Sequence, residues 1–149
     1  MADTTTSAAK APWHLWVVGV ISLLWNAMGA LDFTMTQLHN TTWLKAMTPE
    51  QLEYIYASPF WVVAAWGIAT WGSLAGSGLL LTRKAAALPA FVASFIGMIL
   101  TFVYNYLLTD WLGIMGQGVT PAIFSAVIMM ICTLLLVYAL TMRKRGVLR

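Results

Sequence analysis

Four long apolar runs, almost free of charge, constrain this chain more than any other feature. They cover about residues 13–33, 60–81, 85–108 and 119–140, and Asp32 is the only charged residue inside them. A helix needs about 20 apolar residues to cross the roughly 30 Å hydrocarbon core of a bilayer. We therefore predict an all-α membrane protein whose fold is a bundle of four transmembrane helices.

The composition agrees with a membrane environment. Of the 149 residues, 60% are hydrophobic and 9% are charged, whereas soluble domains carry about 25% charged residues. Because so few charges cannot cover a surface in water, we expect the lipid bilayer to be the solvent. The net charge of +3 is too small and too localised to favour a nucleic-acid partner.

The first run is too long to be the core of a signal peptide. Such a core spans roughly 7–15 apolar residues and precedes a small-residue cleavage site, which is missing here. We therefore expect a retained span. The predicted organisation is a disordered cytoplasmic tail at 1–11, one transmembrane domain at 12–142 and a basic cytoplasmic tail at 143–149.

The connector between the first two spans contains a helix-start signal. Thr48 is followed by Pro49 and Gln51, the pattern of a capping box with proline at the first helical position. Leu52 and Ile55 then fall on one face of the predicted helix. We expect a short helix that lies in the membrane interface.

The distribution of charge predicts the orientation. Four spans place both termini on the same side of the membrane, and seven of the eight Lys and Arg residues fall on that side: Lys10, Arg83, Lys84, Arg143, Lys144, Arg145 and Arg149. Lys45 is alone on the other side. By the positive-inside rule, the termini of this multi-pass protein are expected to be cytoplasmic.

The second span carries a stripe of small residues at helical spacing. Its members are Ala65, Ala69, Gly72 and Gly76. Small residues let helix backbones approach closely in lipid, where no hydrophobic force drives helices together. We predict that this stripe is a helix-packing face, and we expect it to offer a contact for a homo-oligomer.

Asn26 and Asp32 are the polar residues of the first span. Asn26 lies roughly 15 Å along the helix from Trp16, near the midplane, and a midplane amide needs a partner because lipid offers none. It is either a link between helices or a ligand or ion contact. Asp32 is an interfacial carboxylate, a proton- or cation-coupling group, or a structural partner of Lys45 or Tyr106.

Three further residues complete the predicted polar pathway. Trp66, Thr101 and Asn105 belong to the same, non-cytoplasmic half as Asp32. Asn26 and Asp32 are about 120° apart around their helix, so another helix has to connect them. The face of the third span that carries Thr101 and Asn105 is the candidate.

The sequence contains no convincing catalytic constellation. His14 and His39 are predicted at opposite membrane faces, so they cannot share one haem iron. Cys132 has no second cysteine to pair with. Gly76-Ser77-Gly78 lacks the full nucleophile pattern. We expect no enzymatic activity, no cofactor and no bound metal.

Four motifs carry a resemblance to a known family. They are Trp25-Asn26-x-x-Gly29-x-x-Asp32-Phe33-x-Met35-Thr36-Gln37, Thr48-Pro49-Glu50-Gln51, Pro59-x-Trp61-x-x-Ala64-x-Trp66 and Tyr104-Asn105-Tyr106. Together they resemble an uncharacterised family of small four-span inner-membrane proteins of proteobacteria, sometimes labelled sugar transporters. The resemblance covers roughly residues 13–110.

The resemblance implies a location and a first functional hypothesis. We expect an integral protein of the bacterial inner membrane that carries out small-solute, sugar-like transport as a homo-oligomer. The alternative is a non-transporting accessory or scaffold subunit of a larger membrane complex. Transport requires Asn26, Asp32 and Asn105 to line one water-accessible cavity, whereas a scaffold does not.

Overall fold

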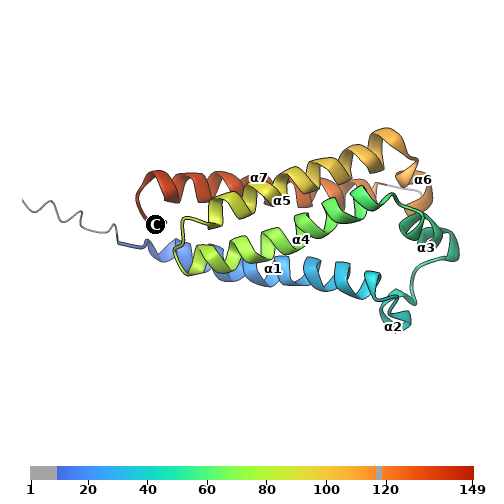
Figure 1. The fold of residues 1–149 in the computed structure, drawn as a ribbon, viewed down its shortest axis with the longest axis horizontal. Coiled ribbons are helices and arrows are strands. Elements are labelled where there is room, and N and C mark those ends of the chain that lie inside the picture. The colour runs from blue at the N-terminus through green and yellow to red at the C-terminus, as the bar shows by residue number, and fades with distance from the viewer. Residues whose placement is uncertain (1–9, 117–118) are drawn as a thin grey trace, which may run out of the picture.

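The computed structural model describes residues 10–116 and 119–149, and these residues form an elongated helical bundle (Figure 1). The expected disorder of the N-terminal tail concerns residues that lie mostly outside this description. The elements are α1 (Trp13–Gln37), α2 (Thr41–Leu44), α3 (Pro49–Tyr56), α4 (Phe60–Leu81), α5 (Ala87–Val103), the π-helical segment η1 (Tyr104–Leu108), α6 (Trp111–Met115) and α7 (Thr120–Lys144). Four spans, with α5 and η1 counted as one, are long and apolar enough to cross a membrane, which confirms the predicted fold class.

The long helices pack in chain order. α1 lies against α4, α4 against α5, and α5 against α7, with α4–α5 the most extensive contact. The short helices α2, α3 and α6 lie together at one end of the bundle, which we call the connector end (Figure 1). The start of α1 and the end of α7 lie at the opposite end, which we call the terminal end.

The start of α3 follows the predicted capping box. The Gln51 amide donates to the Thr48 hydroxyl at 3.2 Å, and the Thr48 amide donates to the Gln51 side-chain oxygen at 3.1 Å. Pro49 occupies the first turn, where its missing N–H is not needed. The short helix expected between the first two spans is therefore present, and the four-residue α2 precedes it.

The small-residue stripe of α4 packs against α5 of the same chain. Gly97 of α5 lies so close that a Cβ there would be 2.5 Å from the Ala65 carbonyl oxygen. The Ser94 hydroxyl donates to the Ala69 carbonyl at 2.6 Å. The stripe is thus a helix-packing face, as predicted. The homo-oligomer contact expected on it stays a prediction, although α5 packs against part of this face.

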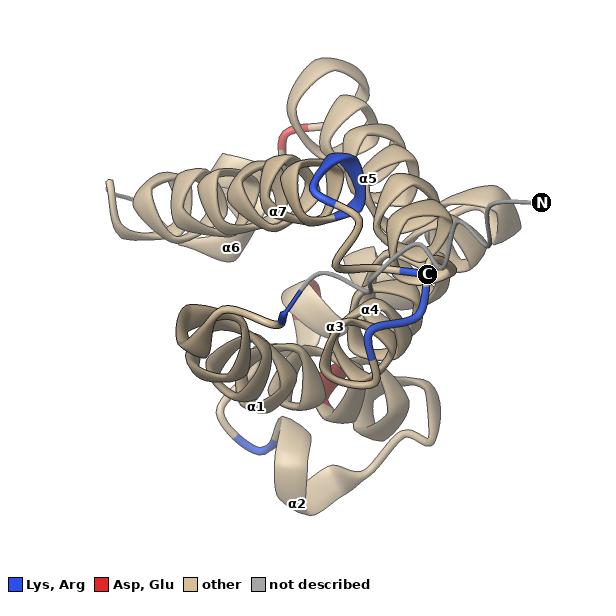
Figure 2. Cartoon of the chain, turned by 90° about the vertical axis from the view of Figure 1, so that its left-hand side faces the viewer, with Lys and Arg blue, Asp and Glu red and all other residues tan. Residues whose placement is uncertain are grey.

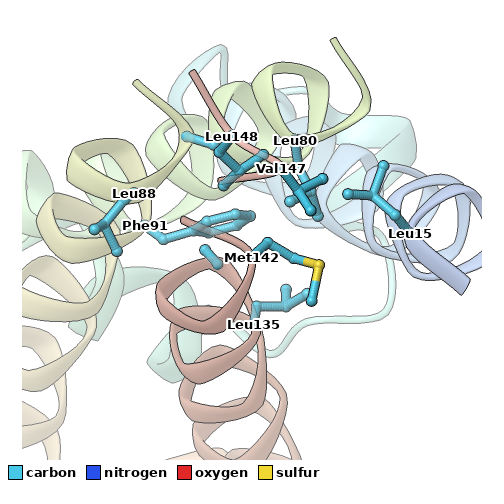
Figure 3. Packing of buried hydrophobic residues seen from close by; sticks show 10 residues of the cluster. Leu15, Leu80, Leu88, Phe91, Leu135, Met142, Val147 and Leu148 are labelled. Carbon is cyan, nitrogen blue, oxygen red and sulfur yellow. The ribbon is translucent and has the colours of Figure 1, made fainter. Parts of the chain in front are cut away.

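An apolar cluster closes the terminal end (Figure 3). It draws buried side chains from all four long helices and from the segment after α7: Leu15, Leu80, Ala87, Leu88, Phe91, Leu135, Ala139, Met142, Val147 and Leu148. The Arg149 amide donates to the Arg83 carbonyl at 3.0 Å, and the Ala85 amide donates to the Arg149 carbonyl at 2.9 Å. The domain boundary expected after residue 142 is therefore too early, since residues 143–149 fold back into the bundle.

Candidate functional site

Asn26 links α1 to α4. Its side chain is 5% exposed, and its amide nitrogen donates to the Ser77 hydroxyl at 2.9 Å and the Ser73 carbonyl at 3.3 Å. Ser77 in turn donates to the Ser73 carbonyl. Because a buried amide in lipid has to find protein partners, this geometry fits the interhelical-link interpretation of Asn26.

Asp32 lies on the exposed side of α1 near the connector end. Its carboxylate accepts a hydrogen bond of 2.9 Å from the Trp43 indole nitrogen, just beyond the start of α2. The structural partner of Asp32 is therefore Trp43, and neither Lys45 nor Tyr106, the two partners expected. The contact ties α2 to the end of α1.

Asn105 contacts α3. The Tyr54 hydroxyl donates to the Asn105 side-chain oxygen at 3.0 Å and lies 2.8 Å from the Thr109 hydroxyl. Asn105 belongs to the π-helical segment η1, whose wider turn changes the face that the following residues present. Burial raises the pKa of the Tyr54 hydroxyl above its ordinary value, since the phenolate would lose its hydration.

Thr101 and Trp66 make local contacts. The Thr101 hydroxyl donates to the Gly97 carbonyl one turn earlier in the same helix, at 2.9 Å. The Trp66 ring meets Phe33 of α1 edge to face, with centroids 5.0 Å apart. The residues that we predicted as one polar pathway thus contact separate neighbours: Asn26 contacts α4, Asp32 contacts Trp43, Asn105 contacts α3, Thr101 contacts its own helix and Trp66 contacts Phe33.

A pocket of about 350 Å³ lies at the connector end, between the end of α1, α2 and α3. We call it the connector pocket, and it is lined by His39, Thr41, Leu44, Lys45, Met47, Leu52 and Tyr56. No sequence pattern predicted this pocket. The available signal was Lys45, the only cation of that connector, but its neighbours in space come from three different elements.

The remaining polar chemistry is sparse. His14 of α1 and Tyr138 of α7 lie with Nδ1 and hydroxyl oxygen 2.6 Å apart, near the terminal end. Within residues 10–116 and 119–149, no three His, Cys, Asp or Glu side chains gather in a way that could hold a metal ion. His14 is therefore engaged in a link between the first and last helices.

These contacts define a multi-pass membrane protein with a helical bundle and a shallow, mostly apolar pocket at the connector end. No protein-family model, characterised protein or solved structure matches the chain.

Proposed function

We propose that this protein is an integral subunit of a bacterial inner-membrane assembly, and that it acts by lateral association with another membrane chain. The observation that carries this proposal is the hydrogen bonding of Asn26, the one amide at midplane depth. Its side-chain nitrogen donates to Ser77 and Ser73 of the same chain, so it is already bonded within the bundle. An amide held in this way stabilises a bundle. The accessory-subunit hypothesis needs such a bundle, whereas transport needs the amide to face a solute.

The last helix supports the lateral contact. α7 has the highest mean hydropathy of the four spans, 2.6, and is the least buried. Five of its apolar side chains are more than half exposed, Phe124 among them, and the other four follow each other at intervals of seven, four and three residues: Ile123, Met130, Leu134 and Val137. This is the spacing at which side chains of two long helices interlock. We call these residues the α7 stripe.

The charges support an orientation with cytoplasmic termini. Figure 2 looks onto the terminal end, where Lys and Arg gather at the helix ends. Seven cations belong to that end, from Lys10 to Arg149, and Lys45 belongs to the other. An excess of this size is typical of the cytoplasmic side of a bacterial membrane protein.

Co-purification in a mild detergent tests the association. Two differently tagged copies are expressed together, so that one pull-down reports both a second copy and a distinct partner chain. We expect Leu134→Trp, which enlarges a residue of the α7 stripe, to reduce the recovered partner about tenfold, the effect of a clash of about 1.4 kcal/mol. Ile96→Trp, at a 54% exposed position of α5, is the matched control and should leave recovery unchanged.

Two results would contradict the proposal. One is a wild-type protein that runs as a monomer without a partner in every mild detergent. The other is solute flux in proteoliposomes that Asp32→Asn abolishes while the bundle stays folded, because this outcome identifies a transporter. Gly72→Leu is unsuitable as a test of association, since a Cβ at Gly72 would already lie 3.3 Å from Ser94 of α5.

A further inference from the structure

We propose that the connector pocket binds the phosphate-bearing headgroup of a phospholipid, with Lys45 as the group that recognises the phosphate. The inference is independent of the proposed association through α7. It rests on the lining of the pocket, on the backbone of His39 and on the exposed residues around the pocket.

The lining combines one cation with hydrogen-bonding groups and an apolar floor. Among the lining residues Lys45 bears an ammonium and Thr41 a hydroxyl, while Leu44, Met47 and Leu52 are apolar, and most of the lining surface is apolar. No ion pair joins Lys45 to a carboxylate in the described part of the chain, and no carboxylate lines the pocket. A phosphate with attached glycerol and acyl carbons matches both parts of this lining, whereas a free inorganic anion matches only the polar part.

His39 has a backbone conformation that histidine seldom adopts. Its φ is +53°, and it ends α1 in the motif where the amides of His39 and Asn40 bond back to the Thr36 and Met35 carbonyls at 3.0 Å each. Glycine usually occupies this position because a side chain there is strained. Strain of this kind is often found at ligand sites.

The His39 side chain forms part of the wall of the connector pocket. Its ring stacks on Tyr56 with centroids 4.1 Å apart and planes 2° apart. The Tyr56 hydroxyl donates to the Thr36 carbonyl at 3.0 Å, which fixes the pair against the end of α1. The two rings therefore form a rigid wall beside Lys45, held by contacts that do not involve a ligand.

The surroundings place the pocket among lipid headgroups. Leu38, directly after α1, is 69% exposed, and Trp43 of α2 is 40% exposed; each is next in sequence to a lining residue, His39 and Leu44. Exposed apolar and indole side chains at the end of a span are typical of the membrane interface. A phospholipid is the phosphate-bearing molecule that is always present at this depth.

Native mass spectrometry of the full chain in a sugar-based, phosphate-free detergent tests the site. Phosphatidylglycerol is titrated in, and diacylglycerol and inorganic phosphate are the comparison ligands. We expect one retained phosphatidylglycerol, weakened about fivefold by Lys45→Gln, with no comparable retention of diacylglycerol. Lys144→Gln removes the same charge from an exposed position at the other end of the bundle and should retain the lipid as the wild type does.

His39→Gly separates ligand binding from folding. Glycine relieves the backbone strain but removes the ring, so we expect weaker lipid retention together with an unchanged or higher unfolding midpoint of the lipid-free protein. The proposal is overturned if Lys45→Gln or His39→Gly binds phosphatidylglycerol like the wild type. It is also overturned if diacylglycerol binds equally well, or if millimolar inorganic phosphate displaces the lipid.

Discussion

The two ends of the bundle are closed by different interactions. The terminal end is closed by apolar side chains that are almost fully buried, such as Leu15, Leu80 and Met142, and by backbone pairing of Arg149 with Arg83 and Ala85. The connector end is closed by hydrogen bonds between side chains and by aromatic contacts around short helices, and much of that surface is exposed. Close apolar packing is therefore concentrated at the terminal end, and polar groups that could meet a ligand are concentrated at the connector end.

One backbone motif occurs at both ends with different consequences. Arg83 follows α4 with φ of +59°, as His39 follows α1 with φ of +53°. The Arg83 side chain donates to the Val147 carbonyl at 3.3 Å and so holds the C-terminal segment. The His39 side chain instead stacks on Tyr56 in the wall of the connector pocket. The same strained turn serves packing at one end and a surface pocket at the other.

The largest expected effect is at the terminal end. Leu80→Ala removes a fully buried side chain from the apolar cluster, and we expect a loss of about 2–5 kcal/mol in unfolding free energy. Leu38→Ala, at a 69% exposed position of the connector end, should cost less than about 0.5 kcal/mol. Unfolding by sodium dodecyl sulfate in mixed micelles measures both, and equal losses would remove the distinction between the ends.

Next in size is the loss of a hydrogen bond at the connector end. Tyr54→Phe removes the hydroxyl that contacts Asn105 and Thr109, and we expect a cost of about 0.5–1.5 kcal/mol. Tyr106→Phe is the matched control, because the buried Tyr106 hydroxyl has no hydrogen-bond partner among residues 10–116 and 119–149. The control should be neutral or stabilising in the same unfolding assay. A larger cost for Tyr106→Phe than for Tyr54→Phe would contradict this assignment.

A smaller effect is expected midway between the ends. Asn26→Leu removes the amide that donates to Ser77 and Ser73, and hydrogen bonds between membrane helices contribute about 0.6 kcal/mol on average. Unfolding in micelles should show a loss of this order, while the helical circular-dichroism signal stays unchanged. Complete failure to fold would instead mean that this single amide determines how α1 and α4 pair.

The smallest effect is a dependence on alkaline pH at the connector end. Burial raises the pKa of Tyr54 in the folded state, so above about pH 10, the ordinary tyrosine value, the unfolded chain loses this proton first. Unfolding free energy should therefore fall as pH rises from the ordinary pKa through the folded pKa. The fall should be steeper in the wild type than in Tyr54→Phe. Comparing the two proteins cancels the contribution of the other titrating groups. Parallel pH curves for the two proteins would show that Tyr54 does not contribute.

Patterns of residues close together in the sequence predicted much of this structure. The four spans follow from length and hydropathy, and the start of α3 follows from Thr48, Pro49 and Gln51 within one turn. The small residues of α4 also predicted a packing face, because residues four apart lie on one side of any helix. These features depend on neighbours along the chain, so the sequence alone determines them.

Tertiary structure decided what the predicted faces contact. The stripe of α4 meets Gly97 of α5, Asn26 meets Ser77, and Asp32 meets Trp43. The connector pocket brings His39, Lys45 and Tyr56 together from separate elements, and Val147 and Leu148 return to the apolar cluster. Hydropathy does not fix how helices rotate against one another in lipid. Close packing and hydrogen bonds between the helices of the folded bundle select that rotation. The residues that each face contacts are therefore known only from the three-dimensional structure.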